Sequence, residues 1–262
     1  MNFKYKRFWE IDFLRGIAII LMVLYHLLFD LSYFGKVNIN INSGIYLIIG
    51  RSAAILFLIL VGISLTLSYS RNKLKTEGNK ENNGENKIYK KFILRGIKIF
   101  SLGLIITFFT WLIFPNNLII FGILHLIGIS IILSLVFLRL NEINKEFNLL
   151  NLFLGIFLMI LGLYLMNFNF NFNWLLWLGV IPYNLSTFDY FPILPWFGFV
   201  LMGLFLGNRF YKNYERQFKF INNPNNMLIT IFQYLGKHSL PIYFIHQPLI
   251  FLFLYIFGII NI

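Results

Sequence analysis

The stretch IDFLRGIAIILMVLYHLLFDL, residues 11–31, is apolar enough to span a bilayer, yet it contains Asp12, Arg15, His26 and Asp30. An α-helix turns by about 100° per residue, which places these four ionisable side chains within an arc roughly 60° wide. A charge at the centre of a bilayer costs ~2.5–3.5 kcal/mol or more. We therefore predict a membrane-spanning helix whose polar stripe faces the protein interior or a wet cavity and avoids lipid.

The whole chain has the composition of an integral membrane protein. Of its 262 residues, 58% are hydrophobic and 12% are charged, with 32 Phe, and the mean hydropathy is +0.74. Apolar runs of about 20 residues, the length that spans a bilayer, recur along it. We predict an all-α polytopic helical bundle of about seven transmembrane helices, within a range of about seven to nine, forming one membrane-embedded domain over residues 1–262. The expected spans are residues 11–31, 45–69, 92–114, 118–138, 149–166, 193–210 and 239–260.

Lysine and arginine determine the expected orientation. The net charge is +12, but the basic residues gather in residues 4–7, 71–91, 139–147 and 209–219, and the segments expected outside hold only Lys36. Because loops rich in Lys and Arg stay in the cytoplasm, we predict a multi-pass protein of the cell membrane with a cytoplasmic N-terminus and no nucleic-acid partner. Segment 71–91 is rich in Asn, Lys, Glu and Gly, and we expect a flexible cytoplasmic loop without a fold of its own.

His26 and Asp30 are the predicted catalytic pair. They lie four residues apart on one helical face, so the carboxylate can orient the imidazole, fix its tautomer and raise its basicity. The alternative is a packing histidine bonded to a nearby carbonyl. The chain has no cysteine, which excludes thiolate nucleophiles and disulfides. A metal site built from His26, Asp30 and His125 is disfavoured because no open-site motif accompanies these residues, and we predict no metal.

Two further polar side chains are expected at depths close to that of Asp30. We hypothesise that Arg51 in the second span pairs with Asp30, because a buried guanidinium needs a carboxylate or several carbonyls. His125 in the fourth span either contacts substrate or bonds a carbonyl, and the sequence favours neither. The outer segment 167–192, with a short helix expected within residues 173–181, fits an interfacial aromatic belt and an acceptor-binding cap equally well.

Basic side chains gather at the cytoplasmic ends of the spans. At the start of the third span, Lys91, Arg95 and Lys98 fall within about 60° of one another on a helical projection. Arg15 lies at the same membrane surface, and Lys237 precedes the last span. Such a group suits a ligand with several phosphates. Ordinary positive-inside flanks are the alternative interpretation of each residue alone.

Four segments of the chain are similar to a known family. They are EIDFLRGIAIILMVLYHLLFDLSYFG (10–35), FGILHLIGIS (121–130), DYFPILPWFGFVLMGLFLG (189–207) and LGKHSLPIYFIHQPLI (235–250). In this order, and over nearly the whole chain, they resemble the small prokaryotic members of the heparan-α-glucosaminide N-acetyltransferase catalytic-domain family. The first helix is also similar to that of the acyltransferase family three, whose Arg-Gly followed by His is matched by Arg15, Gly16 and His26. The Arg-x-x-Arg pattern of that wider group is met only approximately, by Arg95 and Lys98.

The resemblance implies a membrane acyltransferase that moves an acetyl group from cytoplasmic acetyl-CoA to an amine or hydroxyl of an extracytoplasmic sugar or glycan. It implies that Arg15, Arg95 and Lys98 bind the phosphates of acetyl-CoA. His26 then acts as general base or accepts the acetyl group itself, and Asp30 stabilises the imidazolium. The lipid bilayer is the remaining expected partner, and a homodimer is left open. The residues expected to support substrate or structure are Arg51, His125, Asp189 and His246.

The competing hypothesis is a transporter or flippase without acyl transfer, in which the ionisable stripe forms a proton or substrate path. It predicts that solute moves while no acetyl-CoA is consumed. Inverted repeats or paired broken helices would favour it, and the sequence contains no clear example of either.

Overall fold

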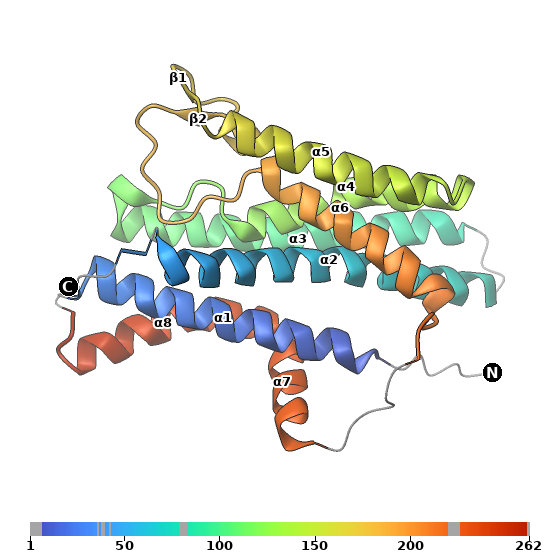
Figure 1. The fold of residues 1–262 in the computed structure, drawn as a ribbon, viewed down its shortest axis with the longest axis horizontal. Coiled ribbons are helices and arrows are strands. Elements are labelled where there is room, and N and C mark those ends of the chain that lie inside the picture. The colour runs from blue at the N-terminus through green and yellow to red at the C-terminus, as the bar shows by residue number, and fades with distance from the viewer. Residues whose placement is uncertain are drawn as a thin grey trace. The chain divides into compact units, whose positions relative to one another are not determined.

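Helices make up nearly all of the regular structure. The computed structural model describes residues 7–260 apart from 36, 38–39, 42, 79–82 and 220–225. Within that part of the chain, seven helices are long and apolar enough to cross a membrane, which confirms the all-α polytopic fold (Figure 1). The α-helices are α1 (Trp9–Tyr33), α2 (Gly44–Gly78), α3 (Gly84–Ile113), α4 (Ile123–Ile143), α5 (Phe147–Leu165), α6 (Ile193–Phe210), α7 (Met227–Lys237) and α8 (Ser239–Ile256).

The remaining elements are short. Strands β1 (Asn169–Phe170) and β2 (Ile181–Pro182) form a parallel pair with Asn169 opposite Ile181. The helix expected within residues 173–181 is reduced to the single turn η2, so the outer segment 167–192 is mostly irregular. The short elements of the described residues are η1 (Pro115–Asn117), β1 (Asn169–Phe170), η2 (Leu176–Leu178), β2 (Ile181–Pro182) and η3 (Lys212–Tyr214).

The chain divides into two compact units. Unit 1 comprises residues 1–60 and 220–262, and unit 2 comprises residues 61–219. Helix α2 contributes residues 44–60 to unit 1 and residues 61–78 to unit 2. The two ends of the chain therefore build one unit together. The expectation of a single membrane-embedded domain stays a prediction.

In unit 1, α1 packs against both α7 and α8. Figure 1 shows α8 alongside α1, and α7 crossing α1 at a steep angle. The crossing is very close: a Cβ on Gly236 would lie 1.7 Å from the carbonyl oxygen of Asp12, and a Cβ on Gly16 would lie 2.1 Å from that of Phe232. Only glycine fits at these two positions, so the glycine of the Arg-Gly pair in α1 has a packing role.

Unit 2 is built mainly from two closely packed helix pairs, α3 with α4 and α5 with α6. At the contact of α5 with α6, a Cβ on Gly198 would lie 2.5 Å from the carbonyl oxygen of Gly155. Lipid provides no hydrophobic force that drives helices together, so close packing at small residues is a main source of their association. Leu126, Leu201 and Leu204 are fully buried in this unit.

The predicted loop without a fold at residues 71–91 is wrong for the described residues. Helix α2 continues to Gly78, and α3 begins at Gly84, so only residues 79–82 lie outside the description. The sequence suggested disorder because this segment is polar. Polar helix ends can fold when their charges find partners on neighbouring helices.

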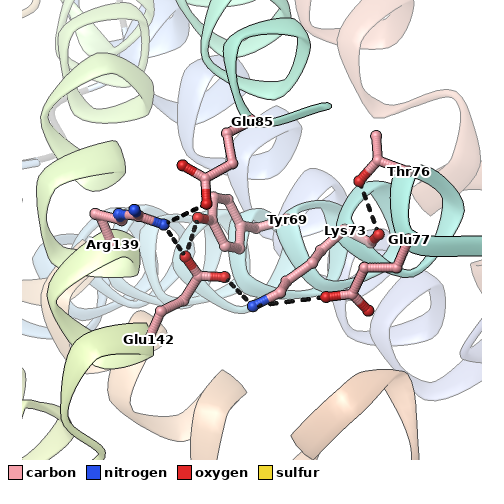
Figure 2. A network of polar contacts seen from close by, with 7 residues as sticks. All are labelled: Tyr69, Lys73, Thr76, Glu77, Glu85, Arg139 and Glu142. Carbon is pink, nitrogen blue, oxygen red and sulfur yellow. Dashed lines mark hydrogen bonds and ion pairs between the residues drawn. The ribbon is translucent and has the colours of Figure 1, made fainter. Parts of the chain in front are cut away.

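Figure 2 shows these partners around Glu142 of α4. The Glu142 carboxylate accepts hydrogen bonds from the Tyr69 hydroxyl at 2.8 Å, the Lys73 ammonium at 2.6 Å and the Arg139 guanidinium at 2.9 Å. Arg139 also donates to Glu85 of α3 at 2.8 Å. This network joins the polar ends of α2, α3 and α4 within unit 2, and it explains why both sides of the predicted loop are helical.

Helix α7 is an element that the sequence analysis did not predict. At 11 residues it is too short to cross a membrane. Its residues lie in a stretch that hydropathy alone does not mark as a span. Lys4, Lys6 and Lys36, on which the predicted orientation partly depends, lie outside the described residues.

Candidate active site

The ionisable stripe of α1 faces protein. Asp30 is 0% exposed, and both of its carboxylate oxygens accept hydrogen bonds of 2.9 Å from the Nε2 amide of Gln247 on α8. Asp12 is also buried, beside Gly236 of α7. The prediction that the stripe avoids lipid is confirmed for these two side chains, because both are buried within the protein.

Two histidines meet between α1 and α8. The ring of His26 is half-buried and lies against the ring of His246, with the ring centroids 4.8 Å apart and the planes inclined by 56°. His246 is 8% exposed, and its Nδ1 atom lies 2.6 Å from the carbonyl oxygen of Tyr243. Its Nε2 atom is buried and has no hydrogen-bond partner. The pair places two imidazoles side by side in the membrane-spanning part of unit 1.

The structure changes two expected contacts of Asp30. Among the described residues no hydrogen bond joins Asp30 to His26, because the carboxylate is bonded to Gln247 instead. The hypothesised ion pair of Asp30 with Arg51 is wrong as well, since Arg51 is exposed while Asp30 is fully buried. The partner of Asp30 is therefore the neutral amide of Gln247 in the last span, and not the guanidinium of Arg51 as predicted.

His125 is fixed in the core of unit 2. It is 2% exposed and lies between the rings of Phe100 and Phe121. Its Nδ1 atom accepts a hydrogen bond from the Gly122 N–H at 3.2 Å, and its Nε2 atom lies 3.5 Å from the Thr107 hydroxyl. Because Nδ1 is an acceptor, a neutral ring carries its proton on Nε2. Both ring nitrogens have protein partners, which favours a structural role.

Asp189 caps the start of α4 from the outer segment. The backbone N–H groups of Ile123 and Tyr190 donate to its carboxyl group, and a Cβ on Gly122 would lie 2.9 Å from its Oδ2 atom. Burial raises the pKa of Asp189 to about 7, although the two N–H groups act in the opposite direction. The Phe191 N–H donates to the Phe121 carbonyl at 2.8 Å and holds the segment beside this helix end. Asp189 thus supports the structure at the outer end of α4.

The predicted phosphate ligands belong to different units. Arg15, in unit 1, forms an ion pair of 3.1 Å with Asp12. Arg95 and Lys98 are exposed on α3 in unit 2. Lys91, one turn before Arg95, donates to the side-chain oxygen of Asn72 at 2.8 Å. Over the described residues, no three His, Cys, Asp or Glu side chains are grouped closely enough to hold a metal ion.

One comparison with known proteins is decisive. The model of the family described as heparan-alpha-glucosaminide N-acetyltransferase, catalytic, matches residues 7–248, nearly the whole chain. The chain belongs to this family. Its members are transmembrane acetyltransferases, so the chain is a membrane-bound enzyme of the acyltransferase class. No curated protein and no solved structure matches it.

Membership in the family indicates acetyl transfer as the chemistry for which the side chains between α1 and α8 are candidates. His26, Asp30 and His246 are among the residues predicted from the sequence, whereas Gln247 and the Tyr243 carbonyl are not. The signal for Gln247 was available, because a glutamine inside a span needs hydrogen-bond partners. Its partner is 217 positions away, too far for any local pattern to indicate.

Proposed function

We propose that this acetyltransferase moves an acetyl group from cytoplasmic acetyl-CoA to an amine or hydroxyl of a sugar or glycan on the other side of the membrane. The observation that carries the proposal is the contact of His26 with His246 inside the membrane-spanning part of unit 1. Imidazole is the side chain best suited to proton transfer near neutral pH. The family match supports the choice of the acetyl group.

The proposed phosphate ligands of the donor are Arg15 in α1 and Arg95 and Lys98 in α3, near the ends of spans that the positive-inside rule assigns to the cytoplasm. Guanidinium and ammonium groups bind phosphates through charge-assisted hydrogen bonds. Arg15 must exchange part of its contact with Asp12 to do so. Arg15 and His26 are separated by a rise of roughly 16 Å along α1. The extended pantetheine arm of acetyl-CoA bridges this rise and brings the thioester to the histidines.

The reaction breaks the thioester C–S bond and forms a C–N or C–O bond to the acceptor. In the direct route, His26 removes the acceptor proton as the acceptor attacks the acetyl carbonyl. In the two-step route, a His26 nitrogen attacks first, and the acetylated imidazole then passes the group to the acceptor. Asp30 places a carboxylate one turn from His26, where it stabilises the positive charge that the imidazole gains in either route.

The orientation in this proposal has the N-terminus in the cytoplasm. Lys and Arg are abundant at the ends of α2 and α3 near Lys73 and Lys91, and in segments 139–147 and 209–219. Residues 167–192 contain neither. The seven candidate spans then place the two chain termini on opposite sides. In this orientation the donor reaches His26 and His246 from the cytoplasm, and the acceptor reaches them from the other side of the membrane.

The test is acetyl transfer by purified protein in proteoliposomes, with labelled acetyl-CoA outside and a panel of amino sugars and glycans as acceptors. We expect labelled product, and a drop of about 10²–10⁴-fold for His26→Ala, the range typical of a lost general acid or base. His238→Ala, which removes an exposed histidine after α7, is the matched control and should retain the wild-type rate.

Two other outcomes argue against the proposal. If no acceptor is acetylated and labelled acetyl-CoA does not bind, the donor assignment fails. Movement of a solute without consumption of acetyl-CoA would then favour the transporter hypothesis. Separately, acid quench of a single turnover distinguishes the two routes, because only the two-step route traps acetyl-histidine at His26.

A further inference from the structure

The two ring nitrogens of His246 are in different situations. Nδ1 lies 2.6 Å from the carbonyl oxygen of Tyr243, one turn earlier in α8. Nε2 is buried, has no hydrogen-bond partner, and belongs to a ring that faces the ring of His26. Buried polar atoms are nearly always paired in proteins, so an unpaired one needs an explanation.

The Tyr243 carbonyl determines which nitrogen carries the proton. A carbonyl oxygen only accepts hydrogen bonds, so Nδ1 of His246 must be the N–H donor. In the neutral ring, Nε2 is then the unprotonated nitrogen, with a free lone pair. His125 shows the opposite arrangement, because its Nδ1 accepts from the Gly122 N–H and its proton lies on Nε2. The two buried histidines are therefore expected as opposite tautomers in one chain.

Packing alone does not account for His246. Pro248 lacks an N–H and leaves the carbonyl of Phe244, four residues earlier, without its helical donor. His246 contacts the carbonyl of Tyr243 instead, so its structural role is a hydrogen bond to that carbonyl. That role uses Nδ1 only. An asparagine would donate to the same carbonyl and leave no ring nitrogen without a partner. Compared with an asparagine, a histidine at position 246 additionally provides the lone pair of Nε2, in a ring that lies beside the ring of His26.

We propose that His246 is the proton acceptor of the acetyl transfer, through Nε2. As the acceptor nitrogen or oxygen bonds to the acetyl carbon, its proton passes to Nε2, and the C–S bond of the thioester breaks to release the CoA thiolate. The protonated His246 then returns this proton to the thiolate, which gives CoA with a free thiol. In the two-step route, Nε2 takes the proton of the acceptor during the second step, and His26 carries the acetyl group.

This assignment rests on the proposed function and changes it at one point. In the direct route His246, and not His26, removes the acceptor proton, so the two histidines have separate tasks. His26 is half-buried and positions or carries the acetyl group, while the more deeply buried His246 holds the proton. Gln247, the next residue in α8, binds both oxygens of Asp30 and fixes this part of α8 against α1.

The tautomers can be measured without any acetyl transfer. Protein labelled with ¹⁵N-histidine and placed in lipid gives nitrogen spectra in which protonated and unprotonated ring nitrogens are resolved, and His246→Asn and His125→Asn assign the signals. We expect Nδ1–H for His246 and Nε2–H for His125. An Nε2–H signal for His246 overturns the proposal, because its free nitrogen would then be absent.

Kinetics test the role itself. His246→Asn keeps a donor for the Tyr243 carbonyl but lacks Nε2, whereas His246→Gln places an amide near the former Nε2 position. If His246 accepts the proton, both variants lose about 100-fold or more of the turnover rate while their gel-filtration profiles stay that of the wild type. If it is only structural, His246→Asn keeps the wild-type rate, which overturns the proposal.

The two possible failures are distinguishable. A wild-type protein that acetylates no acceptor overturns the proposed function as a whole. An active wild-type protein whose His246→Asn variant is equally active overturns only the assignment of His246. An acetylated His26 that accumulates in the His246→Asn variant supports the proposal, because the group is then loaded but not passed on.

Discussion

At the scale of single residues, local partners decide what each ionisable side chain does. His125 and His246 are both buried histidines in candidate spans, yet one has protein partners at both nitrogens and the other at one only. Helical periodicity predicted that His26 and Asp30 share a protected face. It could not predict Gln247 as the partner of Asp30, because the hydrogen bond connects residues 217 positions apart.

The carboxyl group of Asp189 makes the stability of the protein depend on pH. Its pKa is raised from 3.8 to about 7 in the folded protein. Between about pH 4 and pH 7 the folded state therefore binds more protons than the unfolded chain, and the free energy of unfolding falls as the pH rises through this window. We expect the melting temperature of the wild type to fall from pH 5 to pH 8 relative to that of Asp189→Asn.

Thermal unfolding in detergent at several pH values tests this expectation. The two proteins should differ least in their pH dependence above pH 8, where the carboxyl group is ionised in both states. A wild-type curve parallel to that of Asp189→Asn over the whole range would show that this carboxyl group does not titrate near neutrality.

At the scale of elements, the crossing of α1 with α7 depends on the absence of two side chains. Gly236→Ala would place a methyl group 1.7 Å from the Asp12 carbonyl oxygen, so the helices must separate. Overpacking of this kind costs about 1–3 kcal/mol, and we expect a lower melting temperature. Gly78→Ala is the matched control, because a Cβ there meets nothing within 4 Å. Equal melting temperatures for the two variants would contradict the close crossing.

Helix α7 also has an outward apolar face. Met227, Leu228, Ile231 and Tyr234 are 80%, 65%, 44% and 62% exposed, and they lie within one side of a helical projection. An 11-residue helix that crosses a membrane-spanning helix steeply suits the membrane surface, with this face toward lipid. Hydropathy did not indicate α7 because its apolar run is too short for a span.

The network around Glu142 gives a further prediction. Glu142→Gln removes the negative charge that Lys73 and Arg139 share and leaves the size of the side chain unchanged. Charge-assisted hydrogen bonds are about twice as strong as neutral ones, so we expect the ends of α2 and α3 to loosen. Amide exchange of residues 71–78 and 84–91 should become faster. Unchanged exchange would mean that these ends are helical without the network.

At the scale of the whole molecule, the orientation is open to direct measurement. The sequence has no cysteine, so single cysteines report their own surroundings. We expect Asn184→Cys to react with a membrane-impermeant maleimide in intact cells and Lys145→Cys to react only after lysis, because positive loops stay in the cytoplasm. Both residues are exposed. The reverse pattern would invert the donor and acceptor sides.

The global fold was largely predictable, whereas the grouping of its helices was not. Length and hydropathy indicate the spans, since a bilayer needs about 20 apolar residues per helix. They contain no information on which spans pack together, and the pairing of α1 with α8 depends on Gln247, Asp30 and two histidines that no local pattern connects.

That pairing has a consequence for biosynthesis. A ribosome delivers α1 to the membrane first and α8 only after the other candidate spans have emerged, so the nascent chain holds His26 and the buried Asp30 for most of translation without their partners. A half-made chain therefore inserts as an incomplete, inert intermediate, and the imidazole pair forms only when the last helix leaves the translocon.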